Sequence, residues 1–307
     1  MTDAIPQVID HAAHSAFSDP GEFADLFEAI APTPEAVSAV ARNLIVHYAA
    51  TGQRLPEASM FDIHARWLDE ILRLDQIRHP HPLDTSRDES QRVQGCCRDH
   101  TLMSIGILRH HSIAARSRVG FAGYCVDDWH ADHVIVEAWL DGRWQRFDPE
   151  IEAALPDLAA PLDIGHCEVD SAGFVTAAQV WSAYRSGDLD PLTYGVSPAL
   201  PLFAGERFIF DEVIYEIAHR FGDELLLWDG WGRIGEPGTP VSDEDAAWID
   251  PIAALLLAAD AGDLEAELEL LRRYREDGGL HPGPTITRAS PWGEELVEVD
   301  LLTRSHS

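Results

Sequence analysis

The dipeptide Asp141-Gly142 constrains the fold of this 307-residue chain more than any other feature. It separates two short runs, residues 133–140 and 143–147, that are rich in β-branched and aromatic side chains. Asp-Gly between such runs is typical of a two-residue hairpin turn, because both turn residues must adopt positive φ. The sequence therefore predicts an antiparallel hairpin in which Leu140 pairs with Arg143.

Two cross-strand pairs support this register. Continuing the pairing away from the turn sets Trp139 opposite Trp144, an aromatic pair, and Glu137 opposite Arg146, an ion pair. A slip by one residue would turn each side chain to the other face and separate both pairs. We therefore expect Glu137 and Arg146 to form a structural ion pair on one face of the hairpin.

The same register brings a histidine next to a carboxylate. Because side chains alternate between the two faces of a strand, His133 and Asp148 become diagonal neighbours on one face. A carboxylate that bonds one imidazole nitrogen fixes the tautomer and makes the other nitrogen more basic. The hairpin thus predicts that His133 is a general base, and the nucleophile that it would activate has to come from another part of the chain.

Cys97 is the candidate nucleophile. It follows Gly95 and Cys96 at the predicted start of an apolar helix that extends to about His110. The free N–H groups and the dipole at a helix N-terminus favour a thiolate and can stabilise an oxyanion. We therefore expect Cys97, His133 and Asp148 to carry out acyl transfer through a thioester.

The sequence around these three residues resembles the transglutaminase-like superfamily. The resemblance covers residues 95–149, and weaker similarity to stand-alone bacterial members extends over about residues 20–235. It rests on Gly95-Cys96-Cys97-Arg98-Asp99, Leu108-Arg109, Ile113-Ala114-Ala115-Arg116, Gly120-Phe121, His133 with Glu137, Trp144, Phe147-Asp148-Pro149, Trp181-Ser182-Ala183-Tyr184-Arg185, Asp190-Pro191 and Leu227-Trp228-Asp229-Gly230-Trp231-Gly232.

This resemblance implies a catalytic order of cysteine, histidine and aspartate, matched here by Cys97, His133 and Asp148. It also implies an α+β, papain-like fold in which a helix bearing the cysteine packs on an antiparallel sheet bearing histidine and aspartate. The implied chemistry is acyl transfer from an amide or related acyl donor, such as a peptide, a protein, a carrier-bound acyl group or a small amide, to an amine or to water. No cofactor is expected.

Other polar residues near the triad are candidates for the oxyanion hole or for substrate binding. Gln91 and Gln94 precede Cys97, and their side-chain amides are suitable donors to an oxyanion. His100, one turn after Cys97, and His130 are candidates for contacts with substrate, although each residue could equally be a solvated or structural side chain.

Two alternatives compete with a catalytic triad. The pairs Cys97-x-x-His100 and His130-x-x-His133 offer four possible zinc ligands, but their spacing matches no familiar structural zinc site. The other alternative is an inactive transglutaminase-like fold that serves as a binding or scaffolding module. An intact triad argues against it.

The charge of the chain excludes some classes of partner. It carries 53 acidic residues and a formal net charge of −31, so that it would be repelled by nucleic acid and by anionic membranes. All 22 basic residues are arginine. Residues 1–17 lack the pattern of a secretory signal, and the adjacent Cys96 and Cys97 make a poor disulfide framework, so we expect free thiols and a cytoplasmic protein.

The chain is expected to have three parts: an N-terminal helical part of the catalytic domain (1–92), the core with its extension (93–235) and an acidic C-terminal segment (236–307). In the last part, two helices near residues 245–259 and 263–275 precede an extended tail.

The first part is predicted to contain three helices. The first starts near Pro20, the second starts at Pro34 with Tyr48 on its inward face, and the third covers residues 59–77. One further helix is expected around residues 177–185.

Overall fold

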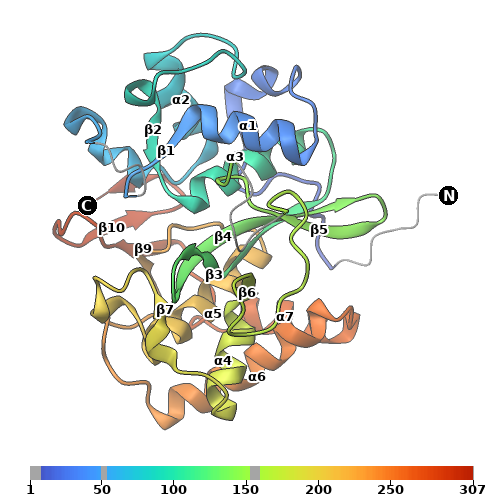
Figure 1. Cartoon of the computed structure of the whole chain (residues 1–307), viewed down its shortest axis with the longest axis vertical. Helices are drawn as coiled ribbons and strands as arrows, with labels where there is room; N and C mark the ends of the chain where they lie inside the picture. The colour runs from blue at the N-terminus through green and yellow to red at the C-terminus, as the bar shows by residue number, and fades with distance from the viewer. Residues whose placement is uncertain (1–7, 50–53, 153–159, 307) are drawn as a thin grey trace.

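A five-stranded sheet lies in the middle of the molecule, between two groups of helices (Figure 1). The computed structural model describes residues 8–49, 54–152 and 160–306. The strands run in the order β5-β4-β3-β6, with β7 pairing with β4. Their bounds are β3 Ala115–Val126, β4 Trp129–Leu140, β5 Arg143–Phe147, β6 Phe174–Thr176 and β7 Tyr194–Gly195. All pairings are antiparallel except that of β7 with β4.

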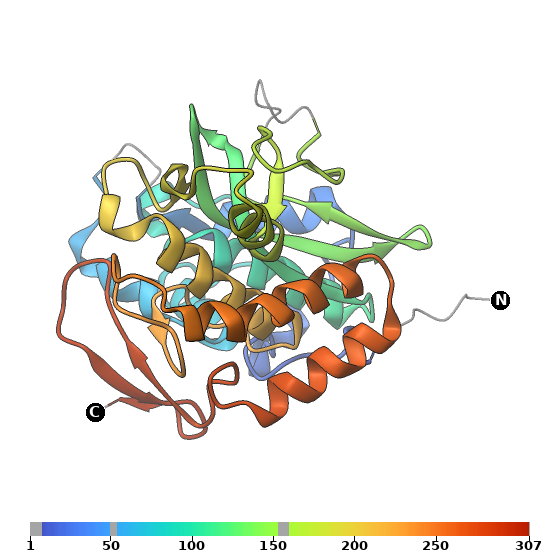
Figure 2. The ribbon, with the colours of Figure 1, turned by 90° about the horizontal axis from the view of Figure 1, so that it is seen from below.

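Helices cover both sides of this sheet. On the N-terminal side α3 packs on β4, and α1 packs on α3; on the other side α5 packs on β3, followed by α4, α6 and α7 (Figures 1 and 2). The bounds are α1 Pro34–Leu44, α2 Leu68–Arg78, α3 Cys97–His110, α4 Ala177–Ser186, α5 Glu206–Arg220, α6 Asp243–Asp260 and α7 Leu264–Glu276. This is the predicted α+β arrangement of a cysteine-bearing helix on an antiparallel sheet.

The hairpin between β4 and β5 has the predicted register. Leu140 pairs with Arg143, and the ladder continues through the Trp139–Trp144 and Glu137–Arg146 pairs. Asp141 and Gly142 both have positive φ, 50° and 79°, as the two-residue turn requires. The local turn chemistry therefore sets the position of every side chain on this part of the sheet.

The N-terminal part departs from the predicted helices. The third of them is divided into a 3-10 helix, η2 (Glu57–His64), and α2. Arg66 lies between the two and is fully buried in an ion pair with Asp229. The first is a 3-10 helix, η1 (Gly21–Phe27).

The second predicted helix begins at Pro34 as expected, with the Thr33 hydroxyl capping it, but ends at Leu44. The chain then enters β1 (Ile45–His47), which pairs in parallel with β2 (Val93–Gly95) immediately before α3. Tyr48 therefore does not lie on a helix, and its backbone N–H donates to the Gly95 carbonyl at 2.9 Å.

The C-terminal segment packs into the rest of the molecule. The two helices expected there are α6 and α7, which lie side by side (Figure 2). The tail forms a sheet in the order β11-β10-β9-β8, with bounds β8 Asp229–Gly230, β9 Thr285–Arg288, β10 Val297–Asp300 and β11 Ser305–His306. One hydrophobic core contains Leu44, Phe210 and Leu270, one residue from each of the three expected parts.

The remaining short elements are η3 (Glu89–Gln91), η4 (Pro191–Thr193) and η5 (Pro201–Phe203). The helix expected around residues 177–185 is α4. Within the described ranges, no helix is both long and apolar enough to cross a bilayer.

Candidate active site

His133 and Asp148 form the hydrogen bond that the register predicts. His133 lies on β4 and Asp148 follows β5 directly, with His133 Nε2 2.7 Å from Asp148 Oδ2. Burial would lower the pKa of His133, but the charge of Asp148 and this hydrogen bond raise it to about 9. Because Nε2 is bonded to the carboxylate, Nδ1 is the nitrogen that remains to exchange a proton with another group.

Asp148 is held from three directions. Its side chain is fully buried, the Tyr124 hydroxyl donates to Oδ2 at 2.7 Å, and the backbone N–H of Glu150 donates to Oδ1 at 2.9 Å. Burial alone would raise the pKa of Asp148, but the charge and hydrogen bond of His133 and the bond from Tyr124 keep it below the ordinary value. Asp148 is therefore an ionised, oriented partner of the imidazole.

Cys97 is the first residue of α3, directly after β2. The Asp99 carboxylate accepts the backbone N–H of Cys96 at 2.8 Å and so caps this end of the helix. A Cβ at Gly95 would lie 2.6 Å from Asp99 Oδ2, which explains why glycine precedes the cysteines. The local sequence thus fixes where the helix, and with it the thiol, begins.

A hydrogen bond ties α3 to β4 beside the triad. The Thr101 hydroxyl, one turn after Cys97, donates to the carbonyl of Val134 at 2.9 Å, and Val134 directly follows His133. Cys97 and His133 also share two charged neighbours, Asp132 and Glu150, whose fields act on the pKa values of both. The fold therefore brings the thiol and the His–Asp pair into one buried region.

The pKa of the Cys97 thiol differs from the sequence-based expectation. Cys97 is 6% exposed, and the side chain of Cys96, burial and the nearby carboxylates of Glu150 and Asp132 raise its pKa well above the ordinary value. The helix N-terminus therefore does not leave a free thiolate here. A thiol with a raised pKa needs a base to remove its proton before it can act as a nucleophile.

Glu150 lies close to the candidate site, although the sequence did not single it out. Its Oε2 is buried and has no hydrogen-bond partner within the described ranges; His100 Nδ1 lies 3.9 Å away. Burial raises the pKa of this carboxyl group. An unpaired buried acceptor next to the triad is suited to an N–H group of a substrate.

The four residues predicted to assist the triad have different positions. The Gln94 amide nitrogen donates to the Pro56 carbonyl and to the Ser59 hydroxyl, both at 2.8 Å, so Gln94 holds η2 rather than offering a donor to an oxyanion. Gln91 ends η3, half-buried, with no hydrogen bond from its side chain to the described part of the chain.

Both candidate histidines have structural contacts. His100 Nδ1 lies 2.9 Å from the Cys96 carbonyl, inside the first turn of α3. His130 stacks on Tyr194 with ring centroids 4.2 Å apart, where β7 joins β4. Where the structure describes the chain, no three His, Cys, Asp or Glu side chains gather to hold a metal ion, so the suggested zinc set does not assemble.

Aromatic side chains from distant segments pack together beside β2. Tyr48 and His47 stack on each other directly beside β2, and both Trp228 and Trp292 contact the edge of Tyr48, with centroids 6.1 and 5.3 Å away. Burial raises the pKa of Tyr48, with contributions from Cys96 and Cys97. His47, Tyr48, Trp228 and Trp292 together form an aromatic wall.

Sequence patterns gave little indication of this wall. Burial and the charge of His133 lower the pKa of His47 to about 4, so His47 is neutral at physiological pH. The β-branched pair Ile45-Val46 before His47 was the available signal for a strand rather than a continuing helix.

Comparison with known proteins found one matching family and one similar solved structure. Residues 49–149, a third of the chain, match the sequence model of the transglutaminase-like superfamily, and the match includes Cys97, His133 and Asp148. Among solved structures, a candidate cysteine protease from Cytophaga hutchinsonii is similar with 18% identity and a TM-score of 0.31, over 58% of this chain and 50% of that one. The chain thus spans about half the length of that protein. No curated protein sequence matches.

Proposed function

We propose, on the premise that residues 49–149 form a domain of the transglutaminase-like superfamily, that the chain is a cysteine-dependent acyltransferase or amide hydrolase. The superfamily match supports a cysteine-based catalytic function. The observation that carries the proposal is the 2.7 Å bond between His133 Nε2 and Asp148 Oδ2, in a region shared with the thiol of Cys97. This pair supplies the oriented base that a thiol of raised pKa requires.

The reaction would begin with proton transfer. Neutral His133 takes the proton of the Cys97 thiol on Nδ1, and the sulfur attacks the carbonyl carbon of the donor. The resulting imidazolium, stabilised by Asp148, returns the proton to the leaving amine when the carbon–nitrogen bond breaks. A thioester on Cys97 remains.

Water or an amine would then resolve the thioester. His133 removes a proton from the incoming nucleophile, which attacks the same carbon, and the sulfur leaves as a thiolate that regains its proton from His133. The carboxylates of Asp132 and Glu150 favour a nucleophile or leaving group that carries positive charge or N–H groups. The free thiols fit a reducing compartment, and we place the enzyme in the cytoplasm.

The test is intact-mass analysis with p-nitrophenyl acetate as the acyl donor, quenched in acid. We expect a burst of nitrophenol and one acetyl group on the wild-type chain, removed by water and faster by methylamine. Cys97→Ala should abolish the adduct. Cys125→Ala is the control for a surface thiol, because Cys125 is an exposed free cysteine, and it should keep the adduct.

Two outcomes would contradict the proposal. An adduct that persists in Cys97→Ala but disappears in Cys125→Ala would assign the reactive thiol to the surface. A wild-type chain that forms no adduct would favour the alternative of an inactive binding or scaffolding module.

A further inference from the structure

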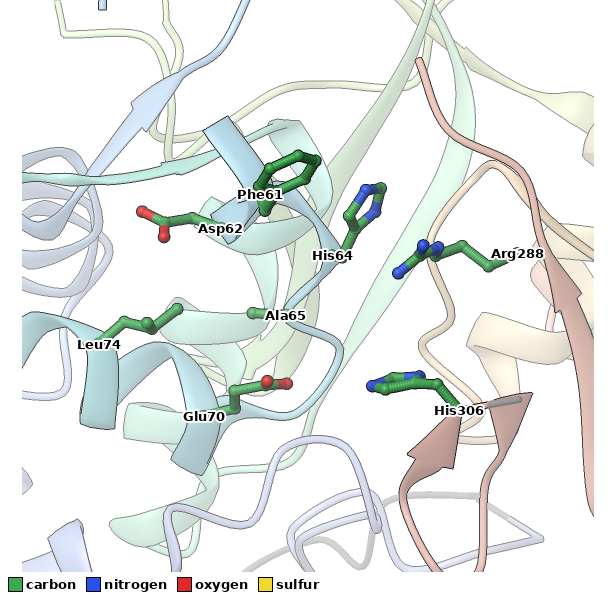
Figure 3. A pocket seen from close by; sticks show the side chains of 8 residues that line it. All are labelled: Phe61, Asp62, His64, Ala65, Glu70, Leu74, Arg288 and His306. Carbon is green, nitrogen blue, oxygen red and sulfur yellow. The ribbon is translucent and has the colours of Figure 1, made fainter. Parts of the chain in front are cut away.

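A cavity of about 320 Å³ lies where the C-terminal sheet meets η2 and α2 (Figure 3). Arg288 at the end of β9 and His306 of β11 form one wall, and Glu70 of α2 faces them across the space. His64 closes one end, and Phe61 contributes an apolar surface. Its volume falls within the range of small-molecule sites.

The guanidinium group of Arg288 points into this cavity and has no hydrogen bond or ion pair with any described residue (Figure 3). This is unusual in a chain with 53 acidic residues and 22 basic ones, where most arginines have a carboxylate partner. Arg288 Nε is also buried from solvent. Arg288 as a whole is half-buried, but a buried N–H group without a partner is costly, and a carboxylate is the partner that the two parallel N–H groups of a guanidinium match best.

The opposite wall has an unpaired group of the other sign. Glu70 Oε2 is buried and has no partner among the residues that the structure describes, and burial raises the pKa of this carboxyl group. The second carboxylate at the cavity, Asp62, is already bound to Arg78 by two hydrogen bonds of 2.5 and 2.6 Å and points away (Figure 3). The backbone N–H of Arg66 and the charges of Arg66 and Arg73 also act on the Glu70 carboxylate, so Oε2 is the atom that remains to pair with a ligand.

The two histidines contribute hydrogen bonds rather than charge. Burial lowers the pKa of both His64 and His306, with the positive charge of Arg288 as a further cause, so both are neutral at pH 7. His64 is 9% exposed; its Nε2 bonds to Glu294 at 3.0 Å, and its Nδ1 has no partner in the described ranges. The cavity thus holds an unpaired guanidinium group on one wall and an unpaired carboxylate oxygen, Glu70 Oε2, on the other.

We propose that this cavity binds a small zwitterion, an α-amino acid with an apolar side chain. Its carboxylate would pair with Arg288, its ammonium group with Glu70, and its side chain would contact Phe61 and Leu74. The two charges of such a ligand match the two unpaired groups of the cavity, whereas a simple anion would leave Glu70 unpaired and a simple amine would leave Arg288 unpaired. This site is separate from the triad and does not depend on the proposed reaction.

The test is titration calorimetry of the full-length protein with L-leucine, N-acetyl-L-leucine and L-leucinamide. L-Leucine should bind at one saturable site, and the acetylated and amidated forms, which each lack one charge, should bind at least about tenfold more weakly. Arg288→Gln and Glu70→Gln should each weaken L-leucine binding by a similar factor. Arg275→Gln removes the same charge from an exposed position on α7 and should leave binding unchanged.

No binding of L-leucine to the wild-type chain would overturn the proposal. So would equal affinity for L-leucine and its acetylated form, which would remove the role of Glu70, or an equal loss in Arg288→Gln and Arg275→Gln. The comparison of L-leucine with its acetylated and amidated forms uses the wild-type protein alone. It therefore tests the proposal even if a substitution impairs folding.

Discussion

Two buried carboxylates, Glu137 and Asp148, lie along the same hairpin, and they differ in whether their charged partners can release a proton. Glu137 is 4% exposed and bound by Arg116, Arg118 and Arg146 at 2.6, 3.2 and 2.8 Å. Asp148 is fully buried, but its charged partner is His133. Arginine keeps its proton at every physiological pH, whereas histidine can release one. One end of the hairpin therefore holds fixed charges, and the other can move a proton.

The arginines around Glu137 also connect the central sheet to helices on one of its sides. Asp260, at the end of α6, accepts hydrogen bonds from Arg118 at 2.8 and 2.5 Å and from Arg220 at 2.7 Å. Glu216 of α5 bonds to Arg118 at 3.0 Å. This network connects the hairpin to α5 and α6, so we assign it to stability, whereas the role that we propose for Asp148 is in the reaction.

The largest expected effect is on activity at Asp148. Asp148→Asn keeps an acceptor for His133 and Tyr124 but removes the charge that stabilises the imidazolium. We expect the rate of the acetylation burst to fall about 10²–10⁴-fold. The free energy of unfolding, measured in urea above about pH 9, where His133 has lost its proton, should change less than in the Glu137 variant. If Asp148→Asn lost stability but kept its burst rate, Asp148 would serve stability rather than the reaction, contrary to this prediction.

The second effect is on stability at Glu137. Glu137→Gln leaves three buried arginines with one fewer negative partner, and we expect a loss of about 3–5 kcal/mol in the free energy of unfolding. Below the unfolding transition, the burst rate of each folded molecule should remain within about threefold of wild type. Glu298→Gln on β10 removes the same charge from an exposed residue and should alter neither quantity. A burst rate that falls with Glu137 would show that this residue serves the chemistry.

The third effect is a pH dependence. The pKa of His133 is about 9, and that of the Cys97 thiol is also raised, so the protonated imidazole must first lose its proton to act as a base. The acetylation rate should rise about tenfold per pH unit and level off above about pH 9. In Asp148→Asn the midpoint should move to lower pH. A wild-type rate that is flat from pH 5 to 8 would instead indicate a preformed thiolate–imidazolium pair.

The same pKa affects stability with a defined sign. Because the folded-state value of about 9 exceeds the ordinary value of 6.5, the protonated His133 stabilises the fold fully below about pH 6.5. This contribution is lost as the pH rises through 9. The arginine cluster around Glu137 should show no such loss in this range.

The smallest effect concerns Tyr124. Tyr124→Phe removes the hydroxyl that donates to Asp148 Oδ2 at 2.7 Å but keeps the ring, which meets the His133 imidazole edge-on. We expect a loss of about 1 kcal/mol in transition-state stabilisation, a three- to tenfold slower burst. An unchanged rate would show that His133 and the Glu150 backbone suffice to hold the carboxylate.

What the sequence could predict was local. The turn at Asp141-Gly142 fixed the register of β4 and β5, and this register placed His133 beside Asp148. The start of α3 at Cys97 followed from Gly95 and from the apolar run after it. In both cases a few neighbouring residues determine the geometry, and the pattern is readable without knowledge of the tertiary fold.

What it could not predict depends on distant segments. The role expected of Gln94 fails because its amide binds Ser59, 35 residues earlier. Tyr48 followed a helical pattern, but β1 leaves the helix to pair with β2. Helix α5 was missed because it is buried on all sides, polar residues such as Glu212 and Glu216 included, so no polar stripe alternates with an apolar one.

The arginine-only composition has a practical consequence for proteolysis. Trypsin cleaves after lysine and arginine, and this chain has no lysine. Arg66, Arg87, Arg98, Arg118 and Arg220 are at most 1% exposed. A protease can reach these peptide bonds only when the surrounding structure opens. The amount of the fragments that result from cleavage there therefore measures the fraction of molecules that have unfolded. The buried arginines that form ion pairs in the core are thus also the cleavage sites at which unfolding of the core can be followed.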